Sequence, residues 1–160
     1  MTLASPSAAR VGGRILVSSY NVNEVEPEIW AEVMKRLRDK HGDRFLYVAT
    51  MHDGLSFGRH LGMKLPAVIE RFETNGGLMP REFVERFREY LRAYLEVFDG
   101  IMAPALCEYK VEGRKKFAHA FYRDFIVPAY AGVASEPAFR GKLLGLPAQL
   151  GYVNPFSLSR

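Results

Sequence analysis

This 160-residue chain has four histidines and one cysteine, and their spacing limits the chemistry that they could carry out. The histidines are His41, His52, His60 and His119. His52 and His60 do not have the spacing of a ligand pair on one helix face, and no His-Glu-x-x-His pattern is present. His52 and Asp53 could form a general base with its orienting acid. Neighbours in sequence rarely reach that geometry, and Asp53 is better placed to cap a helix over residues 54–61. We therefore expect no catalytic site, no metal and no cofactor.

Cys107 is the only cysteine, so the chain has no pair for a disulfide or for thiol–disulfide exchange. A reactive thiolate needs positive surroundings, whereas Glu108 follows directly and its charge disfavours the thiolate. One alternative is a thiol enzyme that uses Cys107 as its single nucleophile. It requires this residue at a helix N-terminus or beside a base, and a connector over 101–111 provides neither.

The charge of the chain limits its partners. The formal net charge is +4, and along residues 80–98 the basic side chains alternate with acidic ones, which is typical of a solvated helix face. Only Arg114, Lys115 and Lys116 form a basic cluster, so nucleic acid is not favoured as a partner. No apolar run reaches the roughly 20 residues that a membrane-spanning helix needs. We expect the partners to be other proteins.

The stretch Met1–Ser19, which begins with the expected tail over residues 1–13, contains Arg10, Arg14 and several serines and alanines but no acidic residue. This composition is similar to that of a mitochondrial presequence. The alternative is a short tail that leads into the first strand. Mitochondrial localisation is favoured over the cytoplasm, and the endoplasmic reticulum is less favoured because no long apolar signal is present.

The order of elements predicts an α/β fold. Short β-rich runs over 14–20, 44–50 and 67–72 indicate strands. Helices are expected from Pro27 to Gly42, from Pro80 to about Phe98, and over 115–129. The apolar positions of the first helix are Ile29, Trp30, Val33, Met34 and Leu37. Strands that alternate with helices imply parallel pairs in a sheet with flanking helices.

The sequence beyond Gly132 is rich in Gly and Pro, and its apolar residues are isolated. These residues are Phe139, Leu143, Leu144, Leu146, Leu150, Tyr152 and Phe156. Their spacing is too irregular to build a core of its own, while a free tail is not normally this apolar. This segment therefore either wraps its own domain or lies along a partner.

Three stretches together resemble a thioredoxin-like domain over residues 14–106, and in particular the non-catalytic b-type domains of protein disulfide isomerases. Residues 30–49 resemble the first helix and second strand of such domains. The run Phe57-Gly-Arg-His-Leu-Gly-Met-Lys-Leu-Pro-Ala-Val resembles the second helix and the proline strand, and Asn75-Gly76 the hairpin turn. Residues 83–106 resemble the last helix of such domains and the segment that follows this helix. The resemblance implies a mixed sheet with flanking helices, followed by an extension over 107–160 with one helix and an irregular apolar tail.

The resemblance also implies a site. The family's Cys-x-x-Cys position is occupied here by residues 21–26, which hold no cysteine, so redox activity does not carry over. By the resemblance, the Leu65–Pro66 peptide would be cis and would lie beside a peptide-binding groove. That groove would involve Tyr20, Val22, Val25, Leu65 and Pro66.

These observations favour a non-catalytic interaction or structural subunit that docks into a larger protein assembly, for example a mitochondrial one. The C-terminal extension would contribute to docking through Phe139, Leu143, Leu144, Tyr152 and Phe156. The alternative within the resembled family is a chaperone-like protein that binds peptides in the groove.

Overall fold

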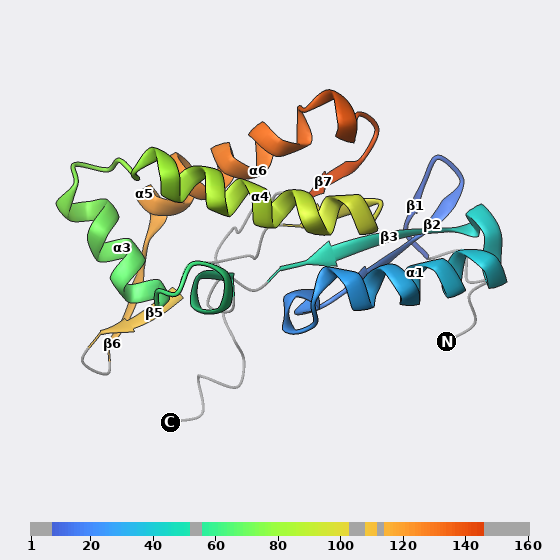
Figure 1. Ribbon diagram of the computed structural model, residues 1–160, viewed down its shortest axis with the longest axis horizontal. Helices are drawn as coiled ribbons and strands as arrows, with labels where there is room; N and C mark the ends of the chain where they lie inside the picture. The colour runs from blue at the N-terminus through green and yellow to red at the C-terminus, as the bar shows by residue number, and fades with distance from the viewer. Residues whose placement is uncertain (1–7, 52–55, 103–107, 112–113, 146–160) are drawn as a thin grey trace.

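The computed structural model describes residues 8–51, 56–102, 108–111 and 114–145. Figure 1 shows the arrangement of their helices and strands. The strands are β1 (Arg10–Val11), β2 (Arg14–Ser19), β3 (Phe45–Thr50), β4 (Gly100–Met102), β5 (Glu108–Val111), β6 (Arg114–Phe117) and β7 (Leu143–Gly145). The α-helices are α1 (Pro27–His41), α3 (Leu65–Thr74), α4 (Arg81–Val97), α5 (His119–Phe121) and α6 (Val127–Ala134). Short helical segments are η1 (Val22–Glu24), η2 (Gly42–Arg44), η3 (Ser56–His60), η4 (Tyr122–Ile126) and η5 (Pro137–Phe139).

The main sheet has five strands in the order β1-β2-β3-β4-β7. Strands β2, β3, β4 and β7 run parallel and lie side by side in chain order, while β1 pairs antiparallel with β2. Strands β5 and β6 form a separate antiparallel pair. The predicted α/β class is confirmed, as are the strands over 14–20 and 44–50.

The long helices lie on one face of this sheet. Right-handed crossovers between parallel strands that follow in sequence place every connection on the same side. Helix α4 accordingly packs against both α1 and α6. The core contains alternate strand residues, such as Ile15, Tyr47 and Ile101. Because side chains alternate between the faces of a strand, one face of the sheet carries this core.

The two longest helices form as their sequences predict. Pro27 stands in the first turn of α1, where its missing N–H is no loss, and Gly42 ends the helix with a positive φ of 55°. Helix α4 follows Pro80 and buries one side, including Phe87, Leu91 and Tyr94. Burial of this stripe against the sheet and α6 is what holds α4 in place.

A cluster of phenylalanines joins η3, α3, α4 and the segment around η4. The ring centroid of Phe57 lies 5.3 Å from that of Phe87 and 5.9 Å from that of Phe121. The ring centroids of Phe87 and Phe125 are also 5.3 Å apart. Phe72 of α3 meets Phe121 edge to face at 5.4 Å. Buried aromatic rings remove a large apolar area from water, so this cluster fixes one end of the molecule.

The predicted strand over 67–72 is wrong. Leu65–Thr74 form helix α3, with Pro66 in its first turn and a trans Leu65–Pro66 peptide. Val68, Ile69 and Phe72 are its buried positions. Phe72 follows Val68 by four residues and Ile69 by three, so a helix turns all three to one side, whereas a strand would divide them between two faces.

The predicted helix over 115–129 is wrong in its first part. Residues 114–117 form strand β6, and helical structure begins at His119. It then continues through η4 and α6 to Ala134. Pro128 stands where the π-helical segment η4 passes into α6, a point at which the hydrogen-bond pattern of the helix changes.

The segment after residue 107 shares the sheet and the core with the rest of the chain. Strand β7 pairs with β4, and Phe121, Phe125, Tyr130 and Phe139 belong to the same core cluster as Ile15. The predicted extension over 107–160 therefore includes elements that complete the domain. No helix in the described ranges has the length and apolarity to cross a membrane.

Candidate functional site

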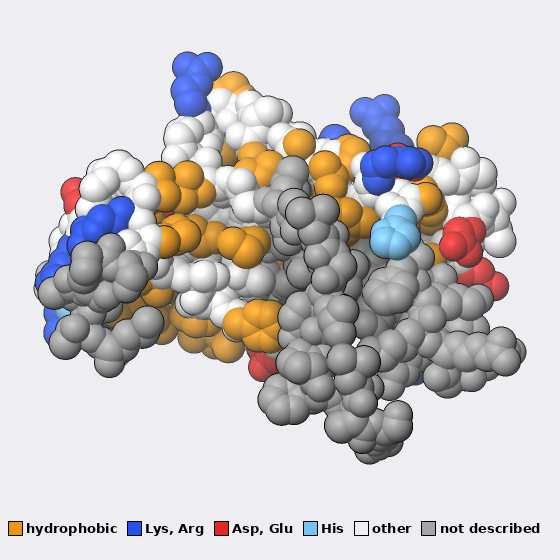
Figure 2. Space-filling view, turned by 180° about the vertical axis from the view of Figure 1, so that it is seen from behind, with side chains coloured by type: hydrophobic (Ala, Val, Ile, Leu, Met, Phe, Trp, Pro, Cys, Tyr) orange, Lys and Arg blue, Asp and Glu red, His pale blue; other side chains and the backbone are white. Residues whose placement is uncertain are grey.

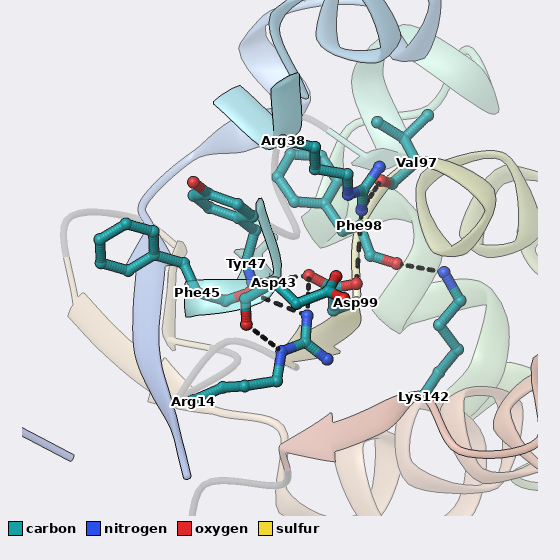
Figure 3. Close-up of polar contacts among 9 residues, drawn as sticks. All are labelled: Arg14, Arg38, Asp43, Phe45, Tyr47, Val97, Phe98, Asp99 and Lys142. Carbon is teal, nitrogen blue, oxygen red and sulfur yellow. Dashed lines mark hydrogen bonds and ion pairs between the residues drawn. The ribbon is translucent and has the colours of Figure 1, made fainter. Parts of the chain in front are cut away.

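A cluster of charged side chains lies where the parallel strands begin, and Asp99 is at its centre (Figure 3). The Asp99 carboxylate is 3.6 Å from Arg14 Nη2 and 3.4 Å from Arg38 Nη2. It also accepts a hydrogen bond of 2.9 Å from the backbone N–H of Tyr47. Arg14 opens β2, Arg38 lies on α1, and Asp99 directly precedes β4. The cluster therefore links elements that are distant in sequence.

The cations of this cluster are also held by backbone carbonyl groups. Arg14 donates to the carbonyl oxygens of Asp43 at 3.1 Å and Phe45 at 2.8 Å. Arg38 donates to that of Val97 at 3.0 Å. Lys142, directly before β7, donates to the carbonyl oxygen of Phe98 at 2.7 Å. We call Arg14, Arg38, Asp99 and Lys142 the amino-edge cluster.

Burial sets the electrostatics of this cluster. It lowers the pKa of Lys142 because the charged ammonium loses water, and Arg38 lowers it further while Asp99 opposes the change. Burial also raises the pKa of Tyr47, an effect that Arg38 counteracts and Asp99 reinforces. In open parallel sheets, ligands bind outside the carboxyl ends of the strands, and this cluster lies at the amino ends. Its contacts are those of a structural cluster that holds the amino ends of the strands together.

An open cleft adjoins the amino-edge cluster. It lies between α1 and the end of α4, with a volume of about 470 Å³. Its lining consists of Ala31, Lys35, Arg38, Asp39, Glu96 and Val97. Acidic and basic side chains alternate around it, so its surface favours neither sign of charge.

The carboxyl ends of the strands carry hydroxyl groups. Ser18 of β2 and Thr50 of β3 are joined by a hydrogen bond of 2.8 Å between their hydroxyl oxygens. Thr50 Oγ1 also lies 4.0 Å from the sulfur of Met102 in β4. His52, Asp53 and Cys107 lie outside the described residues, so the predictions made for them stay predictions. The described part of the chain holds no group of three side chains suited to a metal ion.

The residues predicted to line a peptide groove have different environments. Val22 is fully buried, and its carbonyl oxygen accepts a 2.7 Å hydrogen bond from Trp30 Nε1. The carbonyl oxygen of Val25 accepts one of 2.8 Å from the Tyr94 hydroxyl. Leu65 is partly buried and Pro66 is exposed at the start of α3, while Tyr20 is 76% exposed. Val22 therefore packs in the core and is not available to a peptide.

The residues predicted for docking in the C-terminal segment also differ in their environments. Phe139 is buried in the core, and Leu144 packs against it from β7. Leu143 belongs to the same strand and is partly buried. Tyr152 and Phe156 lie outside the described residues. Up to Gly145, these apolar side chains therefore serve the chain's own domain.

Helix α1 exposes two of the apolar side chains that recur along it at helical spacing. Ile29 is 58% exposed and Val33 is 37% exposed, one helical turn apart. Met34 is buried, and Trp30 and Leu37 pack against the core. The five apolar positions of this helix therefore do not all face the core, and Ile29 and Val33 lie on its exposed side. We call Tyr20, Ile29 and Val33 the α1 surface.

Comparison of the chain with family models, with curated proteins and with solved structures found no match.

Proposed function

We propose that this chain is a non-catalytic interaction subunit that binds another protein through the α1 surface. The observation that carries the proposal is the exposure of Ile29 and Val33 on adjacent turns of a well-packed helix. Apolar side chains presented at i and i+4 form a stripe that a partner helix or groove can cover. Burial of such side chains in a complex removes apolar area from water and favours association.

Tyr20 is a further strongly exposed apolar side chain. It lies in the connection between β2 and α1, and the Trp30–Val22 and Tyr94–Val25 hydrogen bonds hold that connection against α1 and α4. A tyrosine that is 76% exposed on a fixed loop has an apolar ring and a polar tip, which suits an interface anchor. A fixed loop also loses little conformational freedom on binding.

A more specific proposal is that the domain of this interaction subunit is thioredoxin-like. The β2–α1–β3 unit supports it, because a strand, a helix and a parallel strand begin such domains. The helix at Leu65–Thr74 counts against it, since the resemblance needs a strand there. Docking through the α1 surface does not depend on that assignment.

The α1 surface can be tested by a double substitution, Ile29→Glu with Val33→Glu. Both residues are exposed, so the fold should tolerate the change within about 0.5 kcal/mol. The matched control is Lys35→Glu, an exposed position on the same helix that also gains negative charge. The measurement is the size of the complex that each tagged variant forms in its native cells, by native gel and by chromatography. Thermal unfolding of the purified variants checks that they fold.

We expect the control to remain in a complex of the same size as the unaltered chain, and the double variant to migrate as the free chain. If the double variant folds and still enters the full-size complex, the α1 surface does not carry the interaction. If the unaltered chain migrates alone, the chain is not a stable subunit.

A further inference from the structure

Helix α1 stands at one margin of the layer of helices. Figure 1 shows the order α1, α4 and α6 across this layer, and α4 is the long helix that packs against α1. Ala31, Lys35 and Asp39 of α1 line the cleft on the side of α4. Ile29 precedes Ala31, and Val33 precedes Lys35, by two residues, which is about 200° around a helix. Ile29 and Val33 therefore lie on the flank of α1 that is turned away from α4.

This outer flank carries a charge of opposite sign at each end of its apolar pair. Glu26 directly precedes the helix, and Arg36 follows Val33. Along the flank the order is Glu26, Ile29, Val33 and Arg36, and all four side chains are exposed. Steps of three, four and three residues keep them on one side of the helix. The spacing is the same in both directions, while the charge reverses.

We propose that the partner of this outer flank is a second copy of the chain, whose α1 lies antiparallel to it. The inference rests on the proposed function, because it names the partner of Ile29 and Val33. Positions 26 and 36 lie equally far from position 31, and so do positions 29 and 33. A two-fold axis at the level of Ala31 therefore places Ile29 opposite Val33 of the second copy, and Glu26 opposite its Arg36.

The charges select this orientation over a parallel one. A parallel second copy would place Glu26 opposite Glu26 and Arg36 opposite Arg36, and like charges across an interface disfavour a complex. Exposed acidic side chains continue toward the N-terminal end of α1 with Glu24 and Glu28, and exposed basic ones toward its C-terminal end with Lys35 and Lys40. In an antiparallel pair, the acidic end of each helix lies beside the basic end of the other.

The contacts within one chain are compatible with this pairing. Arg36 already forms an ion pair of 2.9 Å with Glu32, and both side chains are more than half exposed. A guanidinium has five N–H donors and a carboxylate has about four acceptor sites. Arg36 can therefore keep Glu32 and also bind Glu26 of a second copy.

Other apolar side chains are less suited to docking. Figure 2 shows hydrophobic side chains gathered across the middle of the molecule on the side turned away from the view of Figure 1. Leu46 and Val48, which alternate with the core positions of β3, are only 7% and 3% exposed. Val11 and Leu78 are exposed singly, in a two-residue strand and in a turn, and isolated apolar residues are common on protein surfaces.

The size of the interface sets the expected strength. Helix α1 has 15 residues and is about 22 Å long, so two such helices bury a small area. Interfaces below about 1,200 Å² in total belong to weak complexes. We therefore expect a dimer that dissociates on dilution through the micromolar range.

The test is sedimentation of the purified full chain over a range from micromolar to millimolar concentration. A reducing agent prevents a disulfide between two copies of Cys107. The variants are Glu26→Arg and Arg36→Glu, each alone and then mixed in equal amounts. The matched controls are Glu70→Arg and Arg71→Glu, which reverse the charge of exposed residues of α3. Thermal unfolding checks that each variant folds.

We expect the unaltered chain and both controls to form a dimer as the concentration rises. Either variant alone places like charges opposite each other twice, so its dissociation constant should rise at least about tenfold. In the mixture, the two introduced side chains face each other and the original charges face each other, so the dimer should return. A variant that merely misfolds could not be rescued in this way.

Two results would overturn the inference. An unaltered chain that stays monomeric over the whole range has no second copy as its partner. A dimer that persists equally in both single variants uses another surface. Neither result decides the proposed function, which fails only if Ile29→Glu with Val33→Glu leaves the complex in native cells intact, or if the unaltered chain migrates alone there.

Discussion

At Gly100, β4 and β7 approach each other closely. A Cβ atom built at Gly100 would lie 2.5 Å from the carbonyl oxygen of Leu143 and 2.7 Å from its Cβ. Both atoms belong to a paired strand and cannot turn away as the end of a long side chain can. We therefore expect Gly100→Ala to displace β7 and to destabilise the protein by about 1–3 kcal/mol.

Urea unfolding of Gly100→Ala measures this loss, and Gly58→Ala is its control. A Cβ atom at Gly58 would meet nothing within 4 Å, and Gly58 does not have a positive φ. The control should keep its unfolding midpoint within the usual range for an exposed substitution. Equal midpoints for the two variants would contradict the close approach of β4 and β7.

The Tyr94 hydroxyl gives a second prediction at this scale. Tyr94 is fully buried, and its hydroxyl donates to the carbonyl oxygen of Val25 at 2.8 Å. Tyr94→Phe keeps the ring but leaves this carbonyl without that donor, which should cost about 1 kcal/mol of stability. Tyr20→Phe removes a hydroxyl from an exposed ring and should cost nothing measurable. Chemical denaturation of both variants provides the comparison, and an unaffected Tyr94→Phe protein would count against the bond.

The sequence does not reveal the amino-edge cluster, for a physical reason. Arg14, Asp99 and Lys142 are separated by long stretches of chain, and each is an ordinary charged residue in its own surroundings. One weak signal exists, because each stands at or directly before the start of a strand of the main sheet. Only the pairing of the strands brings the three side chains together, and the pairing is a property of the fold.

At the scale of elements, an ion pair fastens η5 and the end of α6 to α4. Arg92 of α4 forms hydrogen bonds to both carboxylate oxygens of Glu136, with distances of 2.8, 3.0 and 3.1 Å. These bonds lower the pKa of Glu136 from its ordinary value of 4.5, against an opposing effect of burial. Both side chains are 31% exposed, so solvent screens the pair in part.

The lowered pKa of Glu136 has a defined effect on stability. The unfolded chain binds a proton at this carboxyl group before the folded chain does, so the pair stabilises the fold above about pH 4.5. This contribution is lost as the pH falls through the folded-state pKa. Glu136→Gln should therefore lower stability by up to about 1 kcal/mol at pH 7, and the difference should vanish at strongly acidic pH.

Denaturant unfolding at a series of pH values checks this prediction, with Glu70→Gln on the exposed side of α3 as the control. The control should differ little from the unaltered protein at any pH. A deficit of Glu136→Gln that persists unchanged through the acidic range would show that Arg92 does not stabilise the ionised carboxylate.

The two long helices and the strands over 14–20 and 44–50 are predictable from this sequence, whereas residues 65–74 are not. Helices α1 and α4 extend over several turns and have a proline at their start, so their patterns are unambiguous. Residues 65–74 are harder to assign, because Pro66 can begin either a strand or a helix, and Val68, Ile69 and Phe72 include β-branched and aromatic types that favour strands. The spacing of these three residues fits a helix. Whether the segment forms a helix or a strand also depends on the sheet, because β4 and β7 occupy the positions beside β3 that a strand here would need.

At the scale of the whole molecule, the structure is one packing unit. The core cluster contains residues from Ile15 in β2 to Phe139 before β7. Because β7 and α6 pack on β4 and α4, we expect a single cooperative transition on unfolding. The fluorescence of Trp30, which reports the β2–α1 end, should change at the same urea concentration as the far-ultraviolet circular dichroism. An earlier loss of helix signal would indicate that residues 119–145 unfold separately.

The order of the parallel strands has a consequence for biosynthesis. Strands β2, β3, β4 and β7 join the sheet in the order in which the ribosome produces them, and β1 closes the first edge before β2 is finished. Each newly made strand meets a neighbour that has already emerged, so no strand must be inserted between two others. The sheet can therefore grow at one edge during translation.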